Sequence, residues 1–375
     1  MKNGICLNMI VRDESRVILR CLESVKPYID SWAIVDTGSE DETMDIVRKA
    51  MEDIPGELYQ EEWVNFGHNR DLAFQHAKKH GDYALIIDAD DIFTAVPSFS
   101  WPEEMSRSHY EMDINLNNSS YAQARVLKTE CDWKWVGAVH EHPEMDESKA
   151  DIPAQKIIGA KVVSMPDGKR RLMDPKKKFL ADAAMLKEDL KKNPEDSRSV
   201  FYLAQSYRDA GENVLAIDKY RKRSKMGGWP EEVWYSLYQI GVIHDRISNQ
   251  REESLEEFIE GPTINAHLAA YRYRPSRIEP LVSLGRSLRM RGDYHLAYTF
   301  LSRVARAPRP NDRLFMDKSH YDWFALDEYA VCCYHLGMHE EAIKANVELL
   351  ERIPLRSVER IRENIRFSRI KSGIR

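Results

Sequence analysis

The chain has 375 residues, 43% of them hydrophobic and 10% aromatic, and a formal net charge of −6. This length predicts two domains, and the composition is that of a globular protein. The negative charge argues against a general nucleic-acid binder. No apolar run approaches the roughly 18 residues of a membrane span, and Asn8 within the first apolar run, Ile5–Val11, argues against a signal peptide.

The cysteines indicate a reducing compartment. Their number, five, is odd, and no Cys-x-x-Cys spacing occurs. The neighbours Cys332 and Cys333 are poorly placed to pair with each other. We therefore expect reduced thiols in a cytoplasmic protein.

Apolar runs alternate with segments of helical spacing in the first part of the chain. In order, we expect a strand at Ile5–Val11, a helix at Ile18–Val25, a strand at Trp32–Val35, a helix at Thr43–Met51, a weak strand at Leu58–Trp63, a helix at Gly67–His80 and a strand at Tyr83–Ile87. This alternation predicts an α/β domain with a doubly wound, mainly parallel sheet. Ser39 and Glu42 match a capping box for the second helix.

The pattern changes after this last strand. Apolar and polar residues alternate over Tyr110–Leu116, which predicts a half-exposed strand, and Tyr121–Leu127 is expected to return antiparallel after a turn at Asn117–Ser120. Ile157–Val163 is expected to be a further strand. Residues 166–178 combine proline, glycine and basic residues and are interpreted as a linker.

From residue 179 to the end, the pattern is helical and repeats. Four units match parts of the tetratricopeptide pattern, in which a small residue follows a large one. The pairs are Leu203-Ala204, Ile240-Gly241, Leu284-Gly285 and Tyr329-Ala330. We expect an all-α helical-repeat domain of tetratricopeptide-like hairpins, in which each small residue packs against the next hairpin.

Three carboxylates, Asp88, Asp90 and Asp91, follow the strand that ends at Ile87. Ligands of open α/β sheets bind at the carboxyl ends of strands. Carboxylates this close repel one another unless a cation lies among them, and oxygen ligands favour Mg²⁺ or Mn²⁺. The alternative is a helix cap followed by a solvated acidic turn.

Four segments occur in the order seen in family 2 glycosyltransferases. They are Asn8–Glu14, Val35–Thr43, Asn69–Arg70 and Ile87–Asp91. The resemblance covers about residues 4–145, and the whole chain is similar to the subgroup in which such a domain precedes tetratricopeptide-like repeats. It implies a GT-A fold and the transfer of a sugar from a nucleotide-sugar with inversion. We assign the GT-A domain to 1–165, the linker to 166–178 and the repeats to 179–375.

The resemblance also suggests roles for single residues. Asp90 is the expected metal ligand, and Asp88 is expected near the metal or the ribose. Asp36 is expected to accept a hydrogen bond from the base or ribose of the donor, and a helix cap is the alternative role. Two roles are expected as alternatives for Asp41, a contact with the sugar donor or a favourable charge at the start of a helix. Arg70 begins a helix, where a cation is unfavourable, so it is expected either to hold Asp36 or a phosphate or to be a plain surface arginine.

The segment His140-Glu141-His142 resembles an element of the same subgroup. An imidazole at His140 is expected to complete the coordination of the metal. An inverting transfer also needs a carboxylate that takes the acceptor's proton, and Glu141 is the candidate. The alternative is a polar loop without a catalytic role.

The sequence therefore predicts a metal-dependent glycosyltransferase that uses Mn²⁺ or Mg²⁺ and a nucleotide-sugar donor. The expected acceptor is a macromolecule, a protein or surface glycan rather than a modified DNA base. The repeats are expected to dock the acceptor, to form a homodimer or both. Arg272, Arg274 and Arg277 are interpreted as a phosphate or acidic-acceptor site or as a solvated loop. The competing hypothesis is a non-catalytic repeat scaffold with a vestigial transferase domain.

Overall fold

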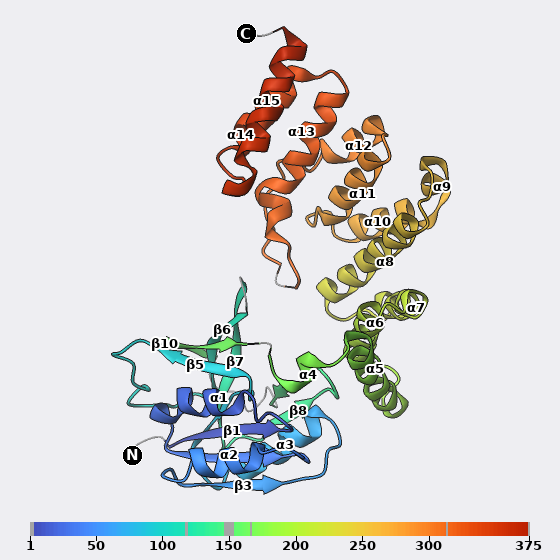
Figure 1. Ribbon diagram of the computed structural model, residues 1–375. Helices are drawn as coiled ribbons and strands as arrows, with labels where there is room; N and C mark the ends of the chain where they lie inside the picture. Colours follow the sequence, from blue (N-terminus) through green and yellow to red (C-terminus); the bar gives the residue numbers. More distant parts are fainter. Residues whose placement is uncertain (1–3, 117–118, 146–153, 166, 313, 374–375) are drawn as a thin grey trace. The chain divides into compact units, whose positions relative to one another are not determined.

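The computed structural model describes residues 4–116, 119–145, 154–165, 167–312 and 314–373. Contacts between residues divide the chain into two compact units, Met1–Pro194 and Glu195–Arg375. The first is built on a sheet with helices, and the second is an array of helices (Figure 1). No helix among the described residues is long and apolar enough to cross a membrane.

The first unit is organised on one large sheet. Its strands are β1 Ile5–Val11, β2 Ser31–Asp36, β3 Gly56–Gln60, β4 Tyr83–Ile86, β5 Asp91–Ala95, β6 His109–Leu116, β7 Ser119–Lys128 and β10 Gln155–Ser164. Their order is β3-β2-β1-β4-β7-β6-β10-β5. The first four strands in that order are parallel, and β7 is antiparallel to both β4 and β6. The predicted mainly parallel α/β sheet is confirmed.

Helices cover both faces of the parallel strands. The alternate β1 residues Ile5, Leu7 and Met9 share a core with α1 (Ile18–Val25) and α2 (Thr43–Ala50). Cys6 belongs to the core on the other face, which includes Phe74 and Ala77 of α3 (Phe66–Ala77). A strand buried on both faces needs no polar alternation, which is why β4 is a continuous apolar run and β1 is interrupted only by the buried Asn8.

The predicted capping box is wrong. Helix α2 has Glu42 at its N-cap, and no side chain caps it there. The Ser39 hydroxyl instead accepts from the Asp13 main-chain N–H at 2.8 Å. Ser39 is therefore used to join the loops that follow β1 and β2, and it is not available to the helix.

The segment after β10 is partly helical. It includes α4 (Lys169–Leu172) and α5 (Pro175–Lys192), and the division by contacts places α5 in the first unit. The domain limits at residues 165 and 179 stay predictions.

The antiparallel pairing of β6 with β7 is confirmed, whereas residues 117–118 of the predicted turn lie outside the described residues.

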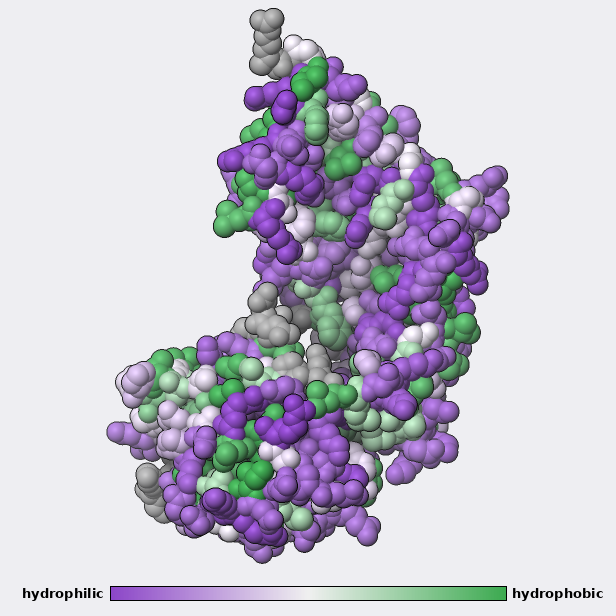
Figure 2. Space-filling model, viewed as in Figure 1, coloured by the Kyte–Doolittle hydropathy of each residue, from purple (hydrophilic) through white to green (hydrophobic). Residues whose placement is uncertain are grey.

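The second unit consists of helical hairpins. Its helices are α6 Ser197–Asp209, α7 Asn213–Lys225, α8 Pro230–Gln250, α9 Leu255–Glu260, α10 Pro262–Tyr273, α11 Glu279–Met290, α12 Tyr294–Leu301, α13 Ala325–His335, α14 His339–Leu349 and α15 Val358–Ser372, with short turns η3 His320–Phe324 and η4 Leu355–Ser357. The predicted repeat units correspond to the packed pairs α6/α7, α8/α10, α11/α12 and α13/α14. Figure 2 shows that hydrophobic side chains are scattered over the visible face of these helices and do not gather in one broad patch.

The expected packing of the small residues is wrong in one respect. A Cβ at Gly285 would lie 2.5 Å from Leu301, and a Cβ at Gly241 would lie 2.8 Å from His267. Leu301 and His267 belong to the second helix of the same hairpin, not to the next one. The small residue therefore allows the two helices of one hairpin to approach each other closely.

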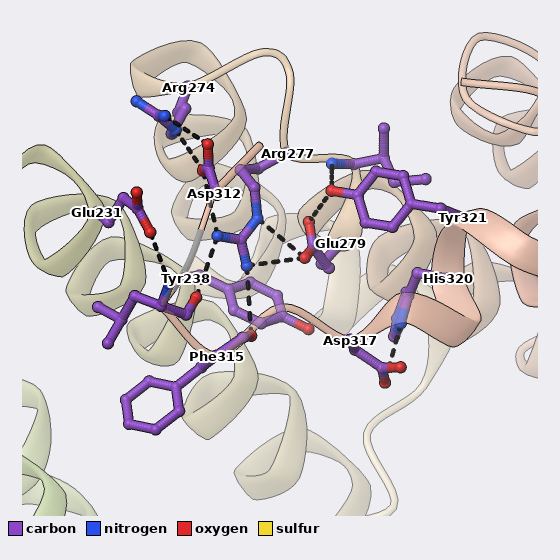
Figure 3. Close-up of polar contacts among 12 residues, drawn as sticks. Glu231, Tyr238, Arg274, Arg277, Glu279, Asp312, Phe315, Asp317, His320 and Tyr321 are labelled. Atoms are coloured by element: carbon purple, nitrogen blue, oxygen red, sulfur yellow. Dashed lines mark hydrogen bonds and ion pairs between the residues drawn. The ribbon is translucent and has the colours of Figure 1, made fainter. Parts of the chain in front are cut away.

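Charged side chains form a network of ion pairs in the second unit (Figure 3), in which Arg277 and Glu279 are buried. Arg277 is fully buried and donates to Glu279 at 3.0 Å and to Asp312 at 3.3 Å. Arg274 donates two hydrogen bonds of 2.6 Å to Asp312. These arginines form an internal ion-pair network, so neither a solvated loop nor an open phosphate site describes them. Arg272 takes no part in the network that the figure draws.

Candidate active site

Three loops meet at the carboxyl ends of parallel strands in the first unit. They follow β1, β2 and β4 and include Asp13–Ser15, Asp36–Thr43 and Asp88–Asp91. The first two are interlocked, since the main-chain N–H groups of Glu14 and Ser15 donate to Thr43 at 2.8 Å and to Asp41 at 3.1 Å. The parallel topology therefore brings together the motifs that the sequence separates.

Asp36 is 1% exposed at the end of β2. Its Oδ1 accepts from the main-chain N–H groups of Gly38 and Ser39, both at 3.0 Å. Its Oδ2 is buried and has no hydrogen-bond partner among the described residues. One oxygen therefore shapes the loop, and the other is left to accept a hydrogen bond from a ligand.

Asp41 serves the start of α2. Its Oδ1 accepts from the N–H and the hydroxyl of Thr43, at 3.0 and 2.5 Å, and its Oδ2 accepts from Ser15. Burial raises the pKa of Asp41, but hydrogen bonds from Thr43 and Ser15 outweigh burial and bring the pKa to about 2. The helix-start interpretation thus has direct contacts, and the donor contact stays a prediction.

Arg70 joins two of the predicted site residues. Its guanidinium donates to Asp88 Oδ1 at 2.5 Å and to Glu141 Oε1 at 2.6 Å. The side chains of Arg70 and Glu141 are each 12% exposed, whereas that of Asp88 is 37% exposed. Burial raises the pKa of Asp88, but Arg70 and Arg125 outweigh it and bring the pKa to about 2. Asp88 is therefore ionised and oriented, and the expected contact of Arg70 with Asp36 is replaced by this pair of carboxylates.

The loop that carries Glu141 is fastened to α3. It lies between β8 (Lys134–Val136) and β9 (His142–Glu144). The N–H of Trp135 donates to Asp71 at 2.6 Å, and the N–H of Phe66 donates to the Ala138 carbonyl at 3.3 Å. Since α3 also carries Arg70, the same helix positions both partners of the ion pair.

His140 is exposed in this loop and has φ of 57°, in the left-handed region that few non-glycine residues adopt. Its role as a metal ligand stays a prediction. His142 Nε2 lies 2.7 Å from Glu144 Oε1, within the small β8–β9 sheet.

Asp90 faces a second carboxylate that the sequence analysis missed. A Cβ built on Gly168 would lie 3.1 Å from Asp90 Oδ2 and 3.0 Å from Glu14 Oε2. Burial and the charge of Asp88 raise the pKa of Asp90. Burial, aided by the charge of Asp90, raises the pKa of Glu14 to about 7. This part of the site has more negative charge than its surroundings compensate.

Asp91 is buried beneath the loop. Its Oδ2 accepts from the Asp88 main-chain N–H at 3.3 Å and lies 3.9 Å from Arg125. Burial and the charge of Asp88 raise the pKa of Asp91 to about 6. Asp91 therefore holds the shape of the loop.

A segment after β10 lies over these carboxylates. Asp167 accepts two hydrogen bonds of 2.8 Å from Arg20, and the main-chain N–H of Lys169 donates to Glu14 at 3.0 Å. The Lys169 ammonium also donates to Asp13 at 2.5 Å. Gly168 passes between these anchors, where a side chain would crowd Glu14 and Asp90.

Asp90 offers carboxylate oxygens of the kind that Mg²⁺ or Mn²⁺ prefers, and burial, followed by the charge of Asp88, raises its pKa. Within the described ranges, no three His, Cys, Asp or Glu side chains are grouped as a complete metal site. Such ions commonly keep positions for substrate phosphates and water, so a partial protein site fits this use.

Several residues of the site were missed for different reasons. Glu14 belongs to the segment Asn8–Glu14 and could have been found from its position after a strand. Arg125 becomes relevant only because β7 pairs with β4. Arg20, Gly168 and Lys169 reach the site through packing and have no local signal.

The comparisons with known proteins agree with this geometry. Residues 6–95, from β1 to β5, match the sequence profile described as Glycosyl transferase family 2. The first unit contains a family 2 glycosyltransferase domain. The matched range includes all three strand-end loops, and the resemblance seen in the sequence is confirmed.

Two relatives match different lengths of the chain. A TPR repeat-containing protein of Synechococcus elongatus is 39% identical over 88 residues, which cover 23% of this chain and 20% of that protein. The SPbeta prophage-derived glycosyltransferase SunS of Bacillus subtilis is 25% identical over 229 residues, which cover 58% of this chain and 52% of SunS. The chain thus spans about a fifth and about half of these relatives.

Two solved structures are also similar in part. MamA is 17% identical and covers 48% of this chain and 95% of its own, with a TM-score of 0.35. TTC0263 of Thermus thermophilus is 16% identical and covers 52% of this chain and 92% of its own, with a TM-score of 0.33. The helical-repeat description rests on the hairpins of the second unit themselves.

Proposed function

We propose that this protein is a glycosyltransferase that moves a sugar from a nucleotide-sugar to a macromolecular acceptor with inversion, in a cytoplasmic setting. The observation that carries the proposal is the meeting of Asp36, Asp88 and Asp90 at the carboxyl ends of parallel strands in a family 2 domain. Oδ2 of Asp36, which has no hydrogen-bond partner among the described residues, is suited to a donor group of the nucleoside, and the half-buried carboxylate of Asp90 is suited to a Mn²⁺ or Mg²⁺ ion.

The residues have distinct proposed tasks. Asp90 would hold the cation, with Asp88 beside it and His140 as a further ligand. The ion, when bound, supplies the positive charge that stabilises a diphosphate leaving group. Arg70 keeps Asp88 and Glu141 in fixed positions through its two short hydrogen bonds.

In the proposed transfer, the acceptor oxygen forms a bond to the anomeric carbon while the bond from that carbon to the diphosphate breaks. The proton of the acceptor passes to the carboxylate of Glu141. The helical unit would dock the acceptor or a second copy of the chain, with a protein or glycan favoured over DNA. The contacts that tie the Glu141 loop to α3 support its positioning.

The test is a panel of nucleotide-sugars with Mn²⁺, measured as transfer and slow hydrolysis. We expect Asp90→Ala to lose at least about 10²-fold in turnover, and EDTA to abolish activity of the unaltered protein. Full activity of Asp90→Ala in EDTA would contradict the metal assignment.

Two further variants separate the roles in the Glu141 loop. Glu141→Gln should retain donor affinity and lose about 10²-fold in turnover, because only the proton acceptor is removed. His140→Ala should instead weaken Mn²⁺ binding, measured by calorimetry. If both variants keep full turnover and Mn²⁺ affinity, the loop has a structural role only.

A further inference from the structure

A cavity of about 530 Å³ lies within the second unit. Ligand pockets typically have about 300–1,000 Å³. Helix α8 contributes Tyr238, Asp245 and Asn249 to the lining, and α11 contributes Ser283, Arg286, Ser287 and Met290. The third wall is the segment from Asp317 to Phe324. On each helix these positions recur at helical spacing, so each helix presents one face to the cavity.

The third wall is held in place by buried charges. Arg277 donates to the carbonyls of Leu314 and Phe315 at 3.2 and 3.3 Å, in addition to its carboxylate partners. The hydroxyl of Tyr321 donates to Glu279 at 2.8 Å (Figure 3). Because Arg277 and Glu279 are buried, the segment that leads to Trp323 is anchored to α11 and the wall is preformed.

Hydrogen bonds also fix the helices that form the other walls. The Ser287 hydroxyl donates to Asp245 Oδ2 at 2.7 Å, and the hydroxyls of Tyr238 and Ser283 lie 3.0 Å apart. Both contacts join α8 to α11. The floor of the cavity is therefore a rigid polar surface.

One acceptor in this lining is left over. Oδ1 of Asp245 is buried and makes no hydrogen bond within the part of the chain that the structure describes. Burial raises the pKa of Asp245 despite the opposing effects of the Ser287 hydroxyl, Arg291 and Arg286. A buried carboxylate oxygen without a donor is costly, and a ligand that supplies a donor relieves that cost.

The neighbouring cations have other partners. Arg291 donates to Ser248 and Asn249, both at 2.8 Å, and lies 4.0 Å from the Phe258 ring. Arg286 lies 3.9 Å from Glu328. The second carboxylate of the lining, Asp317, accepts from Ser319 at 2.6 Å and lies 3.1 Å from His320. Asp245 is thus distinguished from Asp317 by its unused oxygen.

We propose that this cavity binds a lysine or arginine side chain of a polypeptide, with the cationic head at the carboxylate of Asp245. A cation satisfies both the missing hydrogen bond and the charge of the carboxylate, whereas a neutral hydroxyl supplies only the first. The aliphatic stem of such a side chain matches the apolar surfaces of Met290, Trp323 and Phe324, which also line the cavity.

All residues of this cavity belong to the second unit, and none of them belongs to the proposed transfer site. Binding at this site can therefore be measured in protein that has no transferase activity. A failure of the glycosyltransferase proposal would leave this inference standing, and the reverse also holds.

The test uses the full chain labelled with fluorotryptophan, in which the Trp323 resonance is assigned from Trp323→Phe. The probes are blocked peptides that differ only in their central residue, which is Lys, Arg, Gln or Glu. We expect saturable shifts of the Trp323 resonance with the Lys and Arg peptides and not with the Gln and Glu peptides.

The variant Asp245→Asn keeps the shape of the side chain and should weaken binding of the Lys peptide about tenfold or more. The matched control is Glu363→Gln on the exposed surface of α15, which should leave binding unchanged. Equal responses to the Lys and Gln peptides in the unaltered protein, or unchanged affinity in a folded Asp245→Asn variant, would overturn the proposal. The peptide comparison alone decides it if that variant does not fold.

Discussion

Carboxylates have different surroundings in the two units. In the second unit, Glu279 and Asp312 are buried against the guanidinium groups of Arg277 and Arg274, so that each negative charge has a close positive partner. In the first unit, Asp90 and Glu14 face each other, and burial together with neighbouring negative charge raises both of their pKa values.

This difference separates carboxylates that are paired with arginines inside the fold from carboxylates that lie near other negative charge. In a buried ion pair each charge compensates the other, and removal of one partner leaves the other charge buried without compensation. Uncompensated carboxylates at a strand end add little to stability but provide a favourable place for a cation. Asp88 combines both features, since Arg70 orients it while part of its side chain stays exposed.

The largest expected effect is on the buried network. Arg277→Met should lower the free energy of unfolding of the second unit by about 3–5 kcal/mol, because Glu279 loses its guanidinium partner inside the protein. Hydrogen exchange in increasing urea, resolved by peptide, measures each unit separately. Arg362→Met, which removes an exposed pair with Glu359, is the matched control and should cost less than about 1 kcal/mol. Similar losses in the two variants would contradict the comparison.

An intermediate effect is expected on the pH dependence of stability. His267 is buried, and burial and the charge of His244 lower its pKa to about 3. Its unfolded pKa is about 6.5, so the unfolded state binds more protons below that pH, and the second unit should lose about 2 kcal/mol between pH 6.5 and 5.

In the first unit the sign is opposite over the same interval. Glu14 and Asp91 have pKa values raised to about 7 and about 6, so the folded state binds more protons than the unfolded state and gains stability as pH falls. Urea unfolding is measured at each pH, and pulse labelling at one fixed pH then reports the stability of both units. The loss in the second unit should disappear in His267→Phe, and an unchanged loss there would rule out His267 as its source.

The smallest expected effect is that of Asp90, one of the strand-end carboxylates. Asp90→Asn should change the stability of the first unit by less than about 1 kcal/mol. The loss of the hydration of the carboxylate is offset by the loss of its repulsion from neighbouring carboxylates. Asp88→Asn is the matched comparison and should cost about 1–3 kcal/mol, since it takes a charged acceptor from Arg70. Urea unfolding followed by hydrogen exchange measures the stability of both variants. A greater loss of stability for Asp90→Asn than for Asp88→Asn would contradict this prediction.

The local sequence determined much of the architecture. Apolar runs without polar alternation were sufficient for β1, β2 and β4, because strands buried on both faces have no solvent side. The small residues at positions 241 and 285 indicated helical hairpins, because close helix packing excludes a side chain there. The strand-end positions of Asp36, Asp88 and Asp90 also followed from these short-range patterns.

Only the tertiary structure decided how charges far apart in the chain are paired. Arg70 meets Glu141 across 71 residues, and Lys169 meets Asp13 across 156. Ser39 was expected to cap its own helix and instead joins two loops. Electrostatic and hydrogen-bond energies depend on distance in space, and separation along the chain does not specify that distance. The sequence could therefore propose which residues carry charge at the site, whereas the fold alone determined which of those charges are compensated.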